Sequence, residues 1–474
     1  MARTVGTGEA GQNGPARLAG RARRLAHIGS VAVRRGSPFV VRRLRRSNGT
    51  PASAAYERLG AGCQELGATF VKLGQLVASA PGLVGEEMAA AFRPLLDGGP
   101  AVPFDQVRRV AEADLGVPLR RAFAEFDERP VAAASLAVVH RATLLDGRPV
   151  AVKVLRPAID ELVATDLGLV HPLVSQVAAT SGVRQAFIFK GLIEGLAEQL
   201  AEELDLRNEL AAMVSMRDLL ADLGDERIVV PEPLPRLSGR RVLTMQFVDG
   251  VPIDDEAGLD AHGIAARPLV EALVRAWFLG LIRDGVFHGD LHAGNLMLLP
   301  DGRVAVLDWG IVGRLAPQTH VFFRRMLDGL LGDEAAWDDV ARSLVDRFVP
   351  ADHPLAGTVR IEDVVPIARE RAHAFLTRPF GEVSLAEVME GPPLPADLVE
   401  DEWPPLHVLA GRWAAACLHL PVDRAAPTVP DFDRGMFLLV KQLLYFERYG
   451  RRYMADRALF DDAELHRAAR TLRT

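Results

Sequence analysis

The sequence feature that most restricts the fold is a polar loop followed at once by a short hairpin. The loop reads HGDLHAGN over residues 288–295, and LMLLPDGRVAVLDWG follows over residues 296–310. Two apolar runs joined through Asp-Gly are typical of a β-hairpin. Because a hairpin returns the chain to the place where it began, we expect Asp308 to lie beside Asn295.

The side chains of this loop and hairpin suit phosphoryl transfer from ATP. That reaction needs a carboxylate to orient the acceptor hydroxyl and oxygen ligands to hold Mg²⁺ against the phosphates. Asp290 and Asn295 are five residues apart, the separation of base and metal ligand in a kinase catalytic loop. Asp308 stands where a kinase has its metal-binding Asp-Phe-Gly, with Trp309 replacing the phenylalanine. The pattern therefore predicts Asp290 as catalytic base and Asn295 and Asp308 as metal ligands, against the alternative of a chance polar loop.

A second hairpin signal, TLLDGRPVAVKVL, places Lys153 on a strand. In a kinase, a lysine at this place reaches the nucleotide phosphates and pairs with a glutamate from a following helix. We expect Glu209 to be that partner, with Glu203 and Glu198 as alternatives. The usual interpretation of an isolated strand lysine is a solvent-facing side chain, but lysine is rare in this arginine-rich chain. The four lysines are Lys72, Lys153, Lys190 and Lys441, and retained lysines suggest sites that need a compact ammonium.

Two further segments are candidates for nucleotide contact. Ala132, Ala133, Ala134 and Ser135 occupy the place of a kinase glycine-rich loop but contain no G-x-G. Alanine restricts the backbone more than glycine, so this loop is expected to hold nucleotide differently.

Lys72 and Gln75 are three residues apart on a predicted helix and therefore share one face. An acidic helix near Glu203 is a plausible partner for that face. The alternative is an exposed lysine at the end of a helix.

Taken in order, these motifs resemble those of the UbiB (AarF) type of atypical kinase. The motifs are KxGQ at 72–75, the alanine loop, VAVK at 150–153, ExD at 203–205, HxDxHxGN at 288–295 and DxG at 308–310. The resemblance implies an α+β, two-lobed protein-kinase-like fold with an N-terminal helical extension over the active site and a mostly helical C-terminal lobe. It also implies that Lys72 and Gln75 point into the pocket, and that Lys72 pairs with Glu203.

The same resemblance implies ATP or ADP with Mg²⁺ as the bound nucleotide and metal, and a lipid or quinone precursor as acceptor. Two departures leave the preference between ATP and ADP open. The family usually continues the alanine loop with Ile-Gly-Gln-Val, where this chain has Leu136, Ala137, Val138 and Val139. Trp309 is the second departure.

Changes in composition along the chain divide it into four expected segments. Residues 1–50 are expected to form a basic, flexible tail or an amphipathic helix at a membrane surface, and residues 51–128 the helical KxGQ extension. Residues 129–250 are expected to form the N-lobe with the nucleotide-binding strands, and residues 251–474 the helical C-lobe. We find no run of about 20 apolar residues, the length of a membrane-spanning helix.

Positive charge is concentrated at the N-terminus. Residues 1–50 hold eleven arginines and one acid, Glu9, while the whole chain has a net charge of −7. The acidic remainder argues against nucleic-acid binding, since phosphates require a basic surface, whereas the basic segment suits anionic lipid. Two distant cysteines, Cys63 and Cys417, fit a reducing compartment. We therefore expect a cytoplasmic protein with peripheral contact at the inner face of the membrane.

Three other functions fit part of the pattern. A small-molecule phosphotransferase of the aminoglycoside or choline kinase type shares the loop and the following Asp308, but it has no KxGQ extension. A nucleotide-binding scaffold without activity is disfavoured because every expected catalytic side chain is present. A protein Ser/Thr kinase would carry a lysine between Asp290 and Asn295, where this chain has His292.

Overall fold

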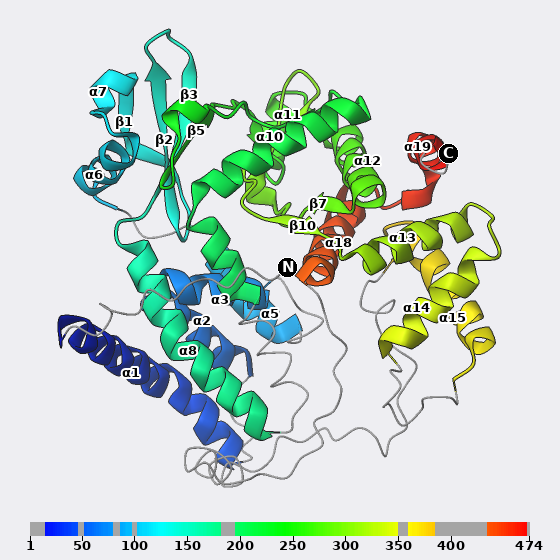
Figure 1. The fold of residues 1–474 in the computed structure, drawn as a ribbon, viewed down its shortest axis with the longest axis horizontal. Coiled ribbons are helices and arrows are strands. Elements are labelled where there is room, and N and C mark those ends of the chain that lie inside the picture. The colour runs from blue at the N-terminus through cyan, green and yellow to red at the C-terminus, as the bar shows by residue number, and fades with distance from the viewer. Residues whose placement is uncertain are drawn as a thin grey trace, which may run out of the picture.

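The computed structural model combines a small antiparallel sheet with a larger helical part (Figure 1). The structure describes residues 15–45, 52–78, 86–96, 102–181, 195–348, 359–383 and 434–471. Within these ranges, no helix is long and apolar enough to cross a membrane.

The N-lobe is a four-stranded antiparallel sheet. Its strand order is β1-β2-β3-β5, and the strands are β1 (Phe123–Ala133), β2 (Ala137–Leu144), β3 (Pro149–Leu155) and β5 (Val242–Gln246). Side chains alternate between the faces of β3, as the period of a strand requires. Val152 and Val154 pack in a cluster with Val107 of α6 (Phe104–Leu115). Lys153 therefore lies on the opposite face, which is turned towards α10 (Leu206–Leu223).

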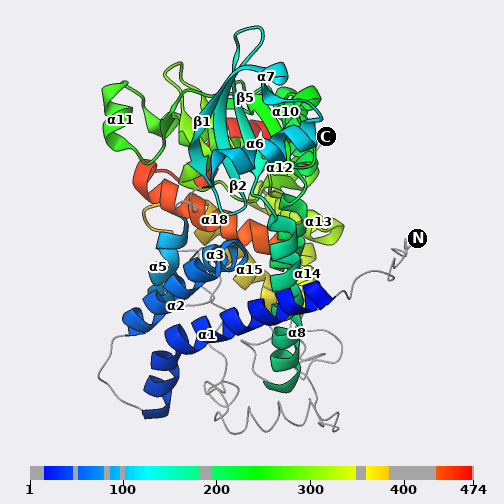
Figure 2. The ribbon, with the colours of Figure 1, turned by 90° about the vertical axis from the view of Figure 1, so that its left-hand side faces the viewer.

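Two helices that we expected in the extension belong to this sheet. Helix α6 and the short α7 (Leu119–Ala122) share the apolar cluster of the outer sheet face, and both lie against it in Figure 2. Strand β1 begins at Phe123, earlier than the boundary expected at residue 129. The apolar side chains of α6 pack in one cluster with valines of β3 and β5. These strands come later in the chain, so the local sequence pattern does not predict the contact.

The C-lobe is built around the buried helix α12 (Ala266–Asp284), with Leu273, Trp277 and Leu281 in the main core. The other helices are α11 (Glu256–Ala261), α13 (Pro317–Leu330), α14 (Ala336–Phe348), α15 (Ile361–Leu376), α18 (Arg434–Tyr453) and α19 (Ala463–Thr471).

Short strands carry the polar loop of the C-lobe. One sheet has the order β4-β9-β8-β6, and β7 pairs with β10. The strands are β4 (Ile228–Val229), β6 (Val251–Pro252), β7 (Val286–His288), β8 (Leu296–Leu298), β9 (Val304–Val306) and β10 (Val312–Arg314). The predicted hairpin is the antiparallel β8–β9 pair, and Gly302 takes a positive φ of 84° at its turn, which glycine adopts without strain. The hairpin returns the chain to Asn295, because the Leu307 amide donates to its carbonyl at 2.9 Å.

The extension consists of short helices below the N-lobe sheet, beside the long helix α8 (Ile159–Ser181). They are α2 (Ala52–Leu66), α3 (Ala68–Ala78), α5 (Glu86–Phe92) and the 3₁₀ turn η1 (Arg93–Leu96). The glycine of the KxGQ motif allows α3 to approach η1, because a Cβ on Gly74 would overlap the Leu95 side chain.

Of the flexible tail and the amphipathic helix that the sequence allowed, residues 15–45 form a helix, α1 (Pro15–Arg45), which packs against α2 and α8 (Figure 2). Arg24 explains the packing. Its guanidinium donates to both oxygens of Asp166 at 2.6 and 2.7 Å and to the Leu66 carbonyl at 2.6 Å. Asp166 is 0% exposed, so the pair is a buried, bidentate contact.

We predict that Arg24→Ala loosens α1. The substitution leaves Asp166 without its counter-ion, and an unpaired buried charge costs about 3–5 kcal/mol unless the helix moves away. Amide hydrogen exchange over residues 19–35 should therefore become much faster than in the wild type. Arg23→Ala is the matched control, because Arg23 is exposed and donates to the Ala19 carbonyl of its own helix. Equal exchange in Arg24→Ala and Arg23→Ala would contradict this account.

Candidate functional site

Lys153 lies between two carboxylates from different parts of the chain. Its Nζ is 2.9 Å from Glu209 Oε2 of α10 and 2.8 Å from Asp308 Oδ2. Lys153 and Glu209 are 11% and 3% exposed, whereas Asp308 is 40% exposed. The predicted Lys153–Glu209 contact is therefore present in the structure, and Asp308 is a third member of the same cluster.

Burial and charge act in opposite directions on this cluster. Burial would lower the pKa of Lys153, but Asp308 and Glu209 outweigh it and hold that pKa well above the ordinary value. Burial would raise the pKa of Asp308, but Lys153 keeps it low. In Glu209, burial and the charge of Asp308 prevail over Lys153 and raise the pKa to about 7. The Lys153 ammonium thus stabilises the ionised form of Asp308, the carboxylate at the exposed side of the cluster.

His288 ties the polar loop to the Asp308 segment. Its Nδ1 accepts a hydrogen bond from the Asp290 amide at 3.0 Å, and its Nε2 lies 2.5 Å from the Asp308 carbonyl. A ring that accepts at Nδ1 and meets a carbonyl at Nε2 must be neutral with its hydrogen on Nε2. Burial lowers the pKa of His288 and favours this neutral form. Trp309 packs edge-on against the His288 ring, with 4.6 Å between the ring centroids. Its Nε1 donates to the Val306 carbonyl, so Trp309 acts here as a packing residue.

Asp290 lies beside a cation from the C-terminal helix. Lys441 Nζ of α18 is 2.8 Å from Asp290 Oδ1, and the two side chains are 9% and 15% exposed. Burial would raise the pKa of Asp290, but Lys441, His292 and Lys72 outweigh it and lower it to about 2. Asp290 is therefore an ionised carboxylate at neutral pH.

The oxygen ligands expected for Mg²⁺ have a suitable arrangement. Asn295 donates through Nδ2 to the Asp290 carbonyl at 3.0 Å, which leaves its Oδ1 for another contact. Asp308 Oδ1 accepts from the Gly310 amide at 2.9 Å, and its other oxygen faces the Lys153 ammonium. A partly exposed carboxylate next to an amide oxygen is a donor set that suits Mg²⁺ completed by phosphates and water. The residues present thus fit the metal.

The alanine loop forms a tight connection between β1 and β2. Ala132 and Ala133 pair with Val139 and Val138, and the Ala134 amide donates to the Ala137 carbonyl at 2.9 Å. Ser135 is buried. Arg156, which the sequence did not indicate, holds this loop. Its Nε and a terminal nitrogen donate to the Ala134 carbonyl at 3.1 and 2.8 Å. The loop is therefore held by the end of β3, close along the chain to Lys153.

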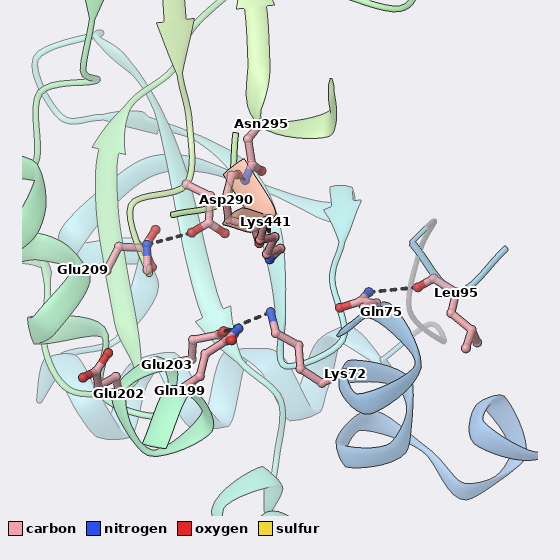
Figure 3. A network of polar contacts seen from close by, with 12 residues as sticks. Lys72, Gln75, Leu95, Gln199, Glu202, Glu203, Glu209, Asp290, Asn295 and Lys441 are labelled. Carbon is pink, nitrogen blue, oxygen red and sulfur yellow. Dashed lines mark hydrogen bonds and ion pairs between the residues drawn. The ribbon is translucent and has the colours of Figure 1, made fainter. Parts of the chain in front are cut away.

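The two polar side chains of the KxGQ motif point to different partners (Figure 3). Lys72 Nζ lies 2.9 Å from Glu203 Oε1, and Gln199 donates to the same oxygen at 2.6 Å. Gln75 Nε2 instead donates to the Leu95 carbonyl at 2.9 Å, within the extension itself. The expected Lys72–Glu203 pair is present, whereas direct contact of Gln75 with nucleotide stays a prediction.

Helix α18 holds the polar loop through three side chains that the motifs did not include. Besides Lys441, Gln442 Oε1 accepts from the Leu291 amide at 2.8 Å, and the Tyr449 hydroxyl donates to the Leu291 carbonyl at 2.8 Å. The one available signal was the rarity of lysine in this chain, which singled out Lys441 without showing its partner.

Comparison with known proteins identifies the family. Residues 94–337 match the ABC1 atypical kinase-like domain. An uncharacterized protein of Mycobacterium tuberculosis is 34% identical over 393 residues, which are 82% of this chain and 78% of that protein. An aarF domain-containing protein kinase of Arabidopsis thaliana chloroplasts, itself uncharacterized, is 31% identical over 82% of this chain and 70% of its own.

A probable protein kinase UbiB of Xanthomonas euvesicatoria is 34% identical over 75% of this chain and 64% of that protein. The chain therefore belongs to the UbiB (AarF) family of ABC1 atypical kinase-like proteins. Family membership, together with the mixed helix and strand content, confirms the expected α+β kinase-like fold.

Glu209 makes the free energy of unfolding depend on pH. Its pKa rises from an ordinary value of 4.5 to about 7 in the folded protein. Between these values the folded state keeps a proton that the unfolded chain has released. This contribution to stability is therefore fully present below pH 4.5 and is lost as the pH rises to about 7. Its full size is about 3 kcal/mol at most.

Chemical denaturation of the metal-free protein at about pH 5 and about pH 7.5 measures this contribution. Glu209→Gln should remove it, so the variant should lose less stability than the wild type over this interval. Glu128→Gln, at an exposed position of β1, is the matched control and should behave as the wild type does. The account is wrong if Glu209→Gln keeps the wild-type pH dependence.

Proposed function

We propose that the protein binds MgATP and transfers its γ-phosphoryl group to an acceptor hydroxyl or to water. One observation carries this proposal: Lys153 Nζ lies within 2.9 Å of Glu209 and 2.8 Å of Asp308. A strand lysine shared by a helix glutamate and the aspartate after the hairpin is the arrangement that phosphoryl-transfer enzymes of the kinase type require. Membership of an atypical kinase-like family supports the same activity.

Each side chain has a role in that reaction. Lys153, held by Glu209, binds phosphate oxygens, and the loop from Ala132 to Ser135 covers them. Asp290, ionised at neutral pH, accepts a hydrogen bond from the acceptor hydroxyl and directs it at the γ-phosphorus.

The transfer step balances without any further reactant. The acceptor oxygen forms a bond to the γ-phosphorus as the bond to the bridging oxygen breaks. ADP leaves with that electron pair, and the acceptor proton passes to Asp290. Mg²⁺, when bound by Asn295 and Asp308, neutralises phosphate charge.

The acceptor is proposed from chemistry and from the family resemblance. A lipid or quinone precursor fits a protein that contacts a membrane from the cytoplasmic side. Helix α1 supports such contact, because it exposes Leu25 and Val33 among arginines. Anionic headgroups would attract those arginines.

A small-molecule phosphotransferase of the aminoglycoside or choline kinase type is the second candidate. It shares the roles of Asp290 and Asp308 but has no extension over the site. Lys72 is 14% exposed and bonded to Glu203, which lies at the end of a helix over residues 195–203, the ExD helix. This contact between the extension and the ExD helix favours the UbiB-like function.

We predict that Asp308→Asn weakens MgATP binding by tenfold or more. The substitution removes a negative charge from the metal ligands, and the metal is the largest local charge in such a site. Calorimetric titration with MgATP measures the effect. Asp301→Asn, at the exposed turn of the same hairpin, is the control and should bind as the wild type does. Unchanged MgATP affinity in a folded Asp308→Asn protein would refute the assignment of this residue.

A substitution at Lys72 tests whether the extension covers the active site. Lys72→Ala breaks the bond to Glu203, so acceptor access should improve and autophosphorylation or phosphate release should rise. MgATP affinity should also change by more than about threefold, whereas loss of a surface side chain usually stays within about 0.5 kcal/mol. Arg109→Ala, exposed on α6, is the control. If Lys72→Ala and Arg109→Ala behave alike, the small-molecule phosphotransferase becomes the better account.

A further inference from the structure

Lysine in this chain is concentrated at the candidate site. Of the four lysines, Lys72, Lys153 and Lys441 each place an ammonium within 2.9 Å of a carboxylate of the site, while Lys190 lies outside the described residues. Arginine supplies nearly all the other positive charge. A lysine ammonium is a compact charge with three rotatable donors, unlike the planar guanidinium. Lys72 and Lys153 belong to recognised motifs, and Lys441 does not.

Lys441 belongs to α18, a helix that is hydrogen-bonded to the polar loop of residues 288–295. Gln442, the next residue, is 0% exposed and binds the Leu291 amide, and Tyr449 binds the Leu291 carbonyl two turns later. At its other end α18 is tied to the ExD segment, because Arg434 donates to both oxygens of Glu202 at 2.5 Å. These contacts set the distance between the Lys441 ammonium and Asp290. Figure 3 shows Lys441 beside Asp290 and on the same side of the network as Asn295.

The loop itself offers no lysine for Asp290. Between Asp290 and Asn295 the chain has Leu291, His292, Ala293 and Gly294. His292 Nδ1 is engaged as acceptor from the Gly294 amide at 3.1 Å. The ammonium that faces Asp290 therefore comes from a helix about 150 residues further along the chain, at 2.8 Å from Oδ1.

We propose that Lys441 is a positioning residue for phosphoryl transfer, which holds the Asp290 carboxylate in the orientation that receives the acceptor hydroxyl. This inference rests on the proposed function. An ammonium on Oδ1 restricts rotation of the carboxylate and leaves Oδ2 for the acceptor proton. Lys441 acts through Asp290 and belongs to the transfer step. It has no part in nucleotide binding, which involves Lys153 and the alanine loop.

The test measures Mg²⁺-dependent phosphate release from ATP, with water as acceptor. Lys441→Met keeps the length of the side chain but removes its charge. It should lower kcat on the order of 10²-fold, a typical contribution of a positioned acid–base group, and leave the KM for MgATP within about threefold. Lys441→Arg restores the charge and should recover at least about tenfold over Lys441→Met. Arg448→Met, exposed on the same helix, is the matched control and should match the wild type.

A double substitution separates a positioning role from a merely structural one. If Lys441 acts through Asp290, then Asp290→Asn combined with Lys441→Met should be no slower than Asp290→Asn alone. Calorimetric MgATP binding establishes that each variant is folded, and Lys441→Gln replaces Lys441→Met if the latter does not fold. A kcat unchanged by Lys441→Met, or a double variant slower than Asp290→Asn, would overturn this inference. Absence of phosphate release by the wild type would instead overturn the proposed function.

Discussion

The ammonium of Lys153, shared between Glu209 and Asp308, is the interaction on which the rest of the site depends. It joins a strand of the N-lobe, the helix that follows it and the segment after the β8–β9 hairpin. A buried charge without its partner is costly, so each of these elements must keep its place. Asp308 is the most exposed member of the cluster, and for this reason we propose it as the member that exchanges its lysine contact for a metal.

Two further lysine–carboxylate contacts surround this centre. Lys72 brings the extension to the ExD helix, and Lys441 brings α18 to Asp290. Segments from both ends of the chain thus contribute one ammonium each to a single polar network. The positive charges that meet the carboxylates of the site are thus lysines, in a chain whose other positive charge is nearly all arginine.

The sequence predicted the parts of the site that depend on local signals. The Asp-Gly turns located both hairpins, and the motifs paired Lys153 with Glu209, a contact that is present in the structure. The packing of α1 and the contacts of α18 with the polar loop were missed, because Arg24–Asp166 and Leu291–Gln442 are contacts between residues 142 and 151 positions apart. No local pattern reports such pairings. The boundary at residue 129 was wrong for the same reason: α6 packs on a sheet whose strands come later in the chain.

The measurement that tests the central claim most directly is a crystal structure with Mg²⁺ and a non-hydrolysable ATP analogue. The account predicts phosphate oxygens at Lys153, the metal on Asp308 and Asn295, and Asp308 turned from Lys153 towards the metal while Glu209 keeps the lysine. It also predicts the γ-phosphate on the side of Asp290 and Lys441. A nucleotide bound elsewhere, or a metal that avoids both Asp308 and Asn295, would contradict it.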